Sequence, residues 1–158
     1  MKNILYILAG LLILILEISI TNDYPIFGVN IDLLLVYIVI LSKNTDAKSN
    51  FIVASALGFL KDILIGLKFG TNIIILVLVS VLIRFTKDKI YEYRNIYPAV
   101  LIILGTVIQC LGYFVVANIY YTGSDLSMFS IILLKKVILN CILGIVVYES
   151  ACNVFDKI

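Results

Sequence analysis

The chain has 158 residues, of which 63% are hydrophobic and 14% charged, and its mean hydropathy is +1.15. Soluble domains carry about 45–50% apolar and about 25% charged residues, and a domain of this length could not hide so much apolar surface in one core. The sequence therefore predicts an integral membrane protein without a soluble catalytic domain, and a net charge of +2 gives no sign of a nucleic-acid partner.

The first predicted membrane span covers residues 4–20. It contains Glu17, and no small-residue cleavage site follows it, so we interpret it as a retained helix rather than a signal peptide. A break at Pro25 separates it from the second span. The purely apolar part of that second segment is too short to cross a bilayer alone. The span is therefore expected to cover residues 26–42 and to include Asp32.

Three further spans are expected in the middle of the chain, at residues 51–65, 71–85 and 98–121. Thr71 or Asn72 is placed to cap the N–H groups at the start of the fourth span. Pro98 lies at the start of the fifth span, where the first turn of a helix tolerates proline.

The last apolar segment is interrupted by Lys135 and Lys136, two adjacent charges that would be costly in the middle of a bilayer. We therefore expect an interfacial helix at residues 126–134 and a sixth span at residues 137–155. Together these segments predict an all-α, polytopic, six-helix transmembrane bundle.

The orientation of this bundle follows from the positive charges in its short loops. If both termini are cytoplasmic, the inner segments hold eight of the twelve basic residues: Lys2, Lys43, Lys48, Arg84, Lys87, Lys89, Arg94 and Lys157. The charge pattern therefore predicts that both termini face the cytoplasm.

A second group of charges falls in or near the outer half of the bilayer on this topology. Its members are Glu17, Asp32, Lys61, Asp62, Lys68, Lys135 and Lys136. Three acids among four bases predict mutual pairing. The group could form a polar outward-facing cavity or a docking site for a partner helix. The alternative is snorkelling at the interface with one or two buried ion pairs.

One face of the third span carries a small-residue pattern. Ala54, Gly58, Asp62 and Gly66 recur every four residues and so share one side of a helix. Small residues allow a neighbouring backbone to approach closely. The face indicates either a groove for a partner helix, in which Asp62 accepts a hydrogen bond or pairs with a lysine, or packing among the chain's own spans. In the turn that follows, Gly70 is expected to supply a positive φ.

The sequence predicts no catalytic residue, cofactor site or metal site. It has no histidine, and its cysteines, Cys110, Cys141 and Cys152, are far apart and expected to be free thiols. Gln109 and Asn140 are single amides within spans. Each is expected to form a hydrogen bond between helices that contributes about 1 kcal/mol.

Several motifs in the second to fourth spans resemble the family of rod shape-determining proteins MreD. They are, in order, Asp32-Leu33-Leu34-Leu35, Gly58-Phe59-Leu60-Lys61-Asp62, Gly66 and Phe69-Gly70-Thr71-Asn72, followed near the C-terminus by Asn140. The chain departs from the family pattern at Ile31, where proline is usual, and at Lys61, where glutamine is common.

This resemblance implies a non-enzymatic, multi-pass protein of the bacterial cytoplasmic membrane, surrounded by membrane lipid. Members bind MreC, a single-span protein. They act with the MreB filament, a RodA-type polymerase and a penicillin-binding transpeptidase to organise lateral peptidoglycan synthesis and so maintain cell shape. The family also resembles the six-helix S-components of energy-coupling factor transporters.

Two alternatives remain from the sequence. One is a vitamin-binding S-component of a transporter. Such proteins usually have an alanine-rich first span, whereas this chain has only Ala9 and Gly10 there. The other is a lipid-handling enzyme, which ranks last because the chain lacks acid–base machinery.

Overall fold

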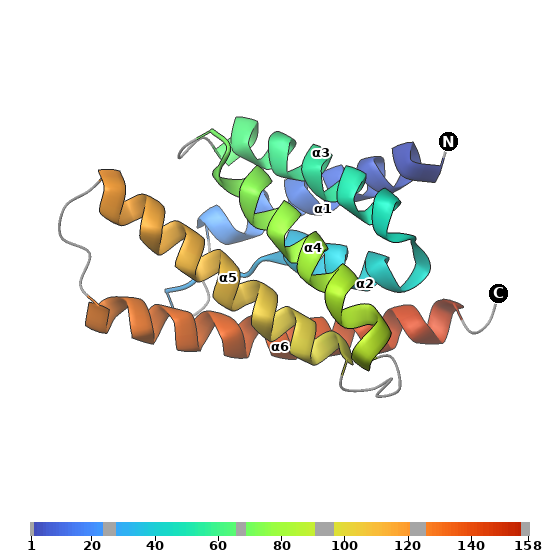
Figure 1. Cartoon of the computed structure of the whole chain (residues 1–158). Helices are drawn as coiled ribbons and strands as arrows, with labels where there is room; N and C mark the ends of the chain where they lie inside the picture. The colour runs from blue at the N-terminus through green and yellow to red at the C-terminus, as the bar shows by residue number, and fades with distance from the viewer. Residues whose placement is uncertain (1, 24–27, 66–68, 91–96, 121–125, 156–158) are drawn as a thin grey trace.

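The computed structural model describes residues 2–23, 28–65, 69–90, 97–120 and 126–155, and this part of the chain folds into six α-helices (Figure 1). They are α1 (Lys2–Asp23), α2 (Leu33–Asn44), α3 (Ala47–Ile65), α4 (Thr71–Ile90), α5 (Tyr97–Tyr120) and α6 (Leu126–Phe155). The prediction of an all-α chain with six helices is confirmed for the described residues. Pro98 lies in the first turn of α5, as expected.

Within the described residues, three helices are long and apolar enough to cross a membrane, over Lys2–Ile20, Pro98–Tyr120 and Ser127–Tyr148. Shorter apolar stretches lie in α2 and α4. Besides its apolar core, the fold exposes many large apolar side chains and buries several charged ones. Ile4 and Leu12 of α1 are each 64% exposed, whereas Glu17 of the same helix is 4% exposed. Apolar side chains facing outward and charges facing inward are what a lipid environment requires.

The short helix α2 lies at the centre of the bundle and contacts each of the other five helices. Its side chains Leu34, Leu35 and Ile38 are fully buried, and they pack in one apolar core with residues of α1, α3, α4 and α5. Its 12 residues extend about 18 Å, which is less than the roughly 30 Å of a hydrocarbon core. α2 is therefore an internal element on which the longer helices pack.

α2 begins later than the sequence suggested. The expected helix from residue 26 is wrong, because residues 28–32 are not helical and Gly28 has a φ of +77°. Asp32 is the N-cap: its Oδ1 accepts a hydrogen bond of 3.2 Å from the backbone N–H of Leu35. Asp32 is thus at the entry to the helix rather than within it. Residues 24–27 lie outside the described part of the chain.

The C-terminal segment also differs from the expectation. α6 is one continuous helix of 30 residues that runs through Lys135 and Lys136, so the division into segments 126–134 and 137–155 is not seen. The two lysines diverge around the helix. Lys136 turns inward, with its side chain 12% exposed, and Lys135 lies on the exposed side. A buried carboxylate near Lys136 offsets its charge, so the helix has no need to break there.

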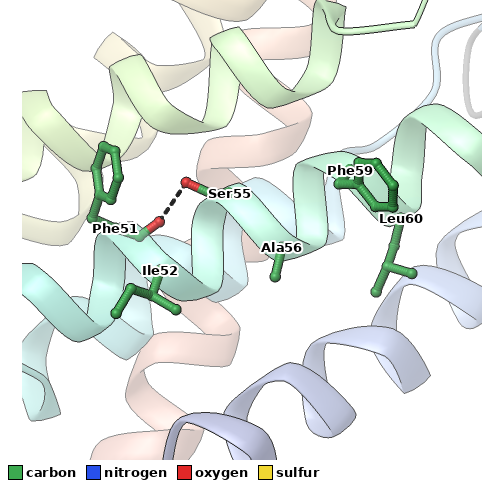
Figure 2. Close-up of a pocket in the computed structure, with 6 residues that line it drawn as sticks. All are labelled: Phe51, Ile52, Ser55, Ala56, Phe59 and Leu60. Atoms are coloured by element: carbon green, nitrogen blue, oxygen red, sulfur yellow. Dashed lines mark hydrogen bonds between the residues drawn. The ribbon is translucent and has the colours of Figure 1, made fainter.

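The outer face of α3 carries a shallow apolar groove of about 560 Å³ (Figure 2). Six residues of this one helix line it: Phe51, Ile52, Ser55, Ala56, Phe59 and Leu60. The Ser55 hydroxyl donates to the Phe51 carbonyl at 2.8 Å. The hydroxyl of this groove is therefore bonded within its own helix.

Candidate functional site

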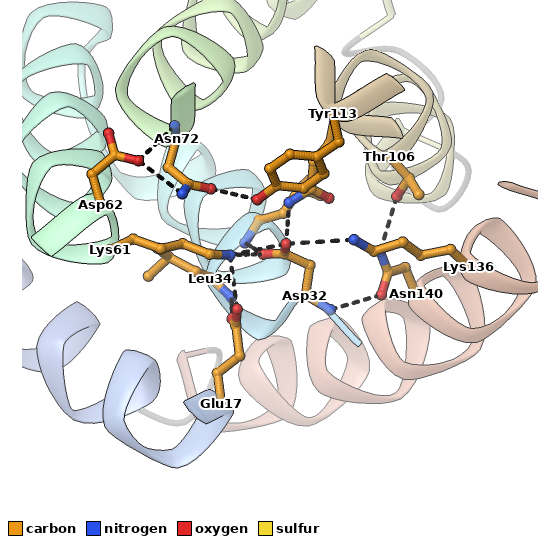
Figure 3. A network of polar contacts seen from close by, with 12 residues as sticks. Glu17, Asp32, Leu34, Lys61, Asp62, Asn72, Thr106, Tyr113, Lys136 and Asn140 are labelled. Atoms are coloured by element: carbon orange, nitrogen blue, oxygen red, sulfur yellow. Dashed lines mark hydrogen bonds and ion pairs between the residues drawn. The ribbon is translucent and has the colours of Figure 1, made fainter. Parts of the chain in front are cut away.

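A buried lysine connects three elements of the bundle (Figure 3). Lys61 Nζ, on α3, donates to Glu17 Oε1 of α1 at 2.7 Å and to both carboxylate oxygens of Asp32 at 3.0 Å. All three side chains are at most 5% exposed. The expected pairing of acids and bases within the bundle is thus confirmed for these residues.

The two acids of this group also hold the start of α2. Glu17 Oε2 accepts a hydrogen bond of 2.8 Å from the backbone N–H of Leu34, and Asp32 Oδ1 accepts one from Leu35. Negative charge beside the N–H groups of a helix start is favourable. Asp32 Oδ2 accepts a further bond from the side-chain amide of Gln109 on α5. Each carboxylate oxygen of Glu17 and Asp32 therefore has a donor.

The polar network continues from Asp32 to α6. Lys136 Nζ lies 3.9 Å from Asp32 Oδ2 and 5.5 Å from the centre of the Tyr113 ring. The backbone N–H of Asp32 donates to Asn140 Oδ1 at 3.0 Å, and Asn140 Nδ2 donates to Thr106 Oγ1 at 3.1 Å. The interhelical hydrogen bonds expected of Gln109 and Asn140 are both present, and both amides belong to the ionic network.

Asp62 belongs to a second group of contacts at the start of α4. Its Oδ2 accepts hydrogen bonds from the backbone N–H groups of Gly70 at 2.9 Å and Ile73 at 3.2 Å. Its Oδ1 accepts from the backbone and the side-chain amide of Asn72, each at 2.9 Å. The hydroxyl of Tyr113 then donates to Asn72 Oδ1. A carboxylate of α3 therefore holds the first turn of α4.

This arrangement corrects one expectation and confirms another. The cap of α4 is supplied by Asp62, from the preceding helix, and not by Thr71 or Asn72. Asn72 instead joins Asp62 to Tyr113. Gly70 has a φ of +96°, the left-handed conformation predicted for this turn.

The small-residue face of α3 is filled by the chain itself. Ala54 is fully buried, and a Cβ added at Gly58 would lie 2.7 Å from the Cα of Ile73. The backbone of α4 therefore occupies the place that a partner helix would need. Of the two interpretations of this face, the structure supports packing within the chain. Gly66 lies outside the described residues.

The predicted outer polar cluster is only partly assembled. Glu17, Asp32 and Lys61 meet, and Lys136 approaches them, whereas Lys135 lies on the exposed side of α6. Lys68 lies outside the described residues. Among the cysteines, Cys110 and Cys141 are free thiols, and nothing is described of the Cys152 side chain.

Sequence reasoning predicted a hydrogen bond for Gln109 but did not find that Thr106 and Tyr113 of α5 join the same network. The three residues are spaced by three and four positions, so they share one face of a mostly apolar helix. This polar stripe was the available signal that α5 turns toward the charges. Within the described ranges, no three histidine, cysteine or acidic side chains gather to hold a metal ion.

No protein-family model matches the chain, and neither a curated protein nor a solved structure matches it. Its function is therefore inferred from the motifs of the sequence and the geometry of the network.

We expect Asp62→Ala to lower the free energy of unfolding by about 2 kcal/mol, because it leaves the buried N–H groups at the start of α4 without an acceptor. Asp62→Asn keeps one acceptor oxygen and should cost less. Asp46 is a matched control, because it accepts from the backbone N–H of Ser49 at 3.2 Å but is exposed. Unfolding in mixed micelles measures the loss of stability for Asp62→Ala, Asp62→Asn and Asp46→Ala. Equal losses for Asp62→Ala and Asp46→Ala would contradict the assigned role.

Proposed function

We propose that this chain is a non-enzymatic membrane scaffold of the MreD kind, acting in the bacterial cell-elongation complex. In this role it binds the single-span protein MreC. With MreB, a RodA-type polymerase and a penicillin-binding transpeptidase, it helps to organise lateral peptidoglycan synthesis.

One observation carries the proposal: four residues of the resemblance are bonded in two pairs that each join different helices of the bundle. Asp32 and Asn140 are bonded to each other across 108 positions, and Asp62 is bonded to Asn72 across 10. Gly58 of the same pattern lies against the backbone of α4 beside Asn72. Residues that determine how helices lock together are those that a family sharing one fold would share.

The interior supports a scaffold because its charges serve to join helices. The network that connects α1, α2, α3 and α6 consists of Lys61, Glu17, Asp32 and Asn140. Both oxygens of each acid accept hydrogen bonds from groups of the chain. Buried polar networks of this kind can specify one arrangement of helices. A bundle held in one arrangement presents a constant outer surface to partners.

The proposal includes a topology and a location. The chain crosses the bacterial cytoplasmic membrane six times, with both termini in the cytoplasm, and the fold is like that of an S-component. Because α2 is too short to cross alone, its crossing includes the non-helical residues 28–32 before it. Because α4 fills the Gly58 face, the MreC helix would meet the outside of the bundle. α1 and α6 present large apolar side chains there, among them Leu8, Leu12, Ile131 and Leu134.

Co-purification with MreC tests the proposal. A tagged form of this chain, expressed with the MreC of the same organism, should retain it after detergent extraction. A single-span protein of similar hydropathy, expressed at the same level, is the control and should be lost. Depletion of the chain in its own host should give rounded cells with delocalised wall synthesis. Rods of normal shape after depletion, together with no retained MreC, would overturn the proposal.

A thermal-shift screen with vitamins distinguishes the scaffold from a vitamin-binding transporter component. A scaffold should show no stabilisation by any vitamin in detergent. A specific shift by one of them would favour a substrate-binding S-component.

A further inference from the structure

A charged pocket of about 680 Å³ lies where the start of α3 meets the second half of α4. It is separate from the buried network, and seven residues line it: Asp46, Ala47, Lys48, Phe51, Ser80, Val81 and Arg84. Lys48 and Arg84 come from different helices, and both are exposed. Two cations therefore border one cavity that also has apolar walls.

This pocket adjoins the apolar groove of α3 at one shared residue. Phe51 lines both cavities, and the groove runs from it to Leu60 (Figure 2). At 1.5 Å per residue, this stretch of helix is about 14 Å long. Half of the hydrocarbon core of a bilayer is about 15 Å. The groove therefore has the length of the acyl region of one leaflet.

The groove offers apolar contact along this whole length. Phe51, Ile52 and Phe59 are 40–46% exposed there, and the Ser55 hydroxyl is bonded to the Phe51 carbonyl. At the far end, the Phe59 ring packs edge-on against Phe69, with ring centres 5.6 Å apart. A ligand with an anionic head and a long apolar tail would fit both cavities.

Asp46 also lines the pocket, and its carboxylate accepts a hydrogen bond from the backbone at the start of α3. Its Oδ2 accepts from the backbone N–H of Ser49 at 3.2 Å, and hydrogen bonds from the side chain and backbone of Ser49 lower the pKa of Asp46. The carboxylate thus acts as a helix cap. Lys48 and Arg84 provide the charge that can attract an anion from outside.

We infer that these two cavities form a binding site for one anionic phospholipid, with its phosphate between Lys48 and Arg84 and one acyl chain along the groove of α3. Basic pockets at the membrane-facing ends of helices bind anionic headgroups. On the topology proposed above, the lipid belongs to the cytoplasmic leaflet. The inference requires that the chain lie in a membrane and does not depend on the MreD assignment.

The test is lipid binding by the purified full chain in detergent, read as the number of retained lipids by native mass spectrometry and as the rise in melting temperature. Phosphatidylglycerol is the ligand, phosphatidylcholine with the same acyl chains is the zwitterionic control, and glycerol phosphate is the free headgroup. We expect one phosphatidylglycerol per chain, bound at least about tenfold more tightly than phosphatidylcholine. Glycerol phosphate should give no shift.

Three variants of lining residues test the parts of the site, and a fourth variant outside it is the control. Lys48→Gln and Arg84→Gln should each weaken phosphatidylglycerol binding by about tenfold. Lys2→Gln removes the same charge from the exposed start of α1, which lines neither cavity, and should leave the affinity unchanged. Ala56→Phe fills the groove without touching the basic pocket, so it should weaken lipid binding as well.

Several results would overturn the inference. Equal binding of the two lipids by the unaltered chain would exclude an anionic site, and this measurement needs no variant to fold. Equal losses of phosphatidylglycerol affinity in Lys2→Gln and Arg84→Gln would show that the positive charge of the whole protein attracts the lipid without a specific site. Binding of glycerol phosphate that matches the lipid, with no effect of Ala56→Phe, would identify a site for a free anion. Displacement of the lipid by an acidic peptide with equal affinity would identify a protein-binding surface.

Discussion

Replacing Lys61 with methionine is expected to lower the free energy of unfolding by about 3–5 kcal/mol. Methionine resembles the stem of lysine in size but carries no charge. The substitution leaves Glu17 and Asp32 buried, 4% and 3% exposed, without the ammonium group that bonds to both. Removing one partner of a buried ion pair is costly because the other charge stays out of water. Unfolding of the detergent-solubilised protein by a graded denaturing detergent measures the loss.

Lys135→Met is the matched control for this prediction. Lys135 is exposed on α6, so the same chemical change there should alter stability by less than about 1 kcal/mol. Adding Glu17→Gln to Lys61→Met should recover part of the stability, because one uncompensated charge is removed. If Lys61→Met and Lys135→Met unfold at the same denaturant concentration, the buried charges do not hold the bundle together.

Gly58→Leu should cost about 3 kcal/mol or more, because α4 leaves no room for a side chain on this face of α3. Even a single Cβ at this position would lie 2.7 Å from the Cα of Ile73 and 3.0 Å from the carbonyl oxygen of Asn72. Both are backbone atoms, so the clash cannot be relieved by rotating a side chain. The two helices would have to separate. The same unfolding measurement in mixed micelles gives the loss.

Gly105 provides the comparison. An added Cβ there would lie 3.3 Å from Leu35 Cδ2, an atom at the end of a flexible side chain. Gly105→Ala should therefore be close to neutral, since the better helix propensity of alanine, worth about 1 kcal/mol, offsets the tighter packing. Gly58→Ala should be clearly destabilising, by about 1–3 kcal/mol. Similar effects of the two alanine substitutions would contradict the close approach of α4 to Gly58.

The Gly58 prediction also affects how partner binding can be tested. If the small-residue face were a groove for MreC, Gly58→Leu would separate MreC from a folded chain. Since α4 covers this face, loss of MreC in that variant would report damage to the bundle. Substitutions at exposed apolar positions, such as Leu12 of α1 or Leu134 of α6, are better probes of a partner surface.

The membrane character and the helices were predictable because they depend on composition and on apolar length. The cap at Asp32 and the inward turn of Lys136 were not. Hydropathy counts Asp32 as one polar residue in an apolar segment, whereas in the structure it begins α2 and receives bonds from α3 and α5. Similarly, a pair of adjacent lysines suggests a break, but on a helix they point in directions about 100° apart. Only Lys136 is turned toward the buried carboxylate of Asp32.

By itself, the sequence determined that this chain must lie in lipid and that its few charges must find one another there, because an unpaired charge in hydrocarbon is too costly to keep. It also predicted the positive φ of Gly70, because the conformation of a tight turn depends on its own residues and not on distant contacts. The tertiary structure decided which charges meet: Lys61 with Glu17 and Asp32, and Asp62 with the start of α4. These partnerships depend on the depth and rotation of whole helices, which packing between distant segments sets and local sequence patterns do not encode.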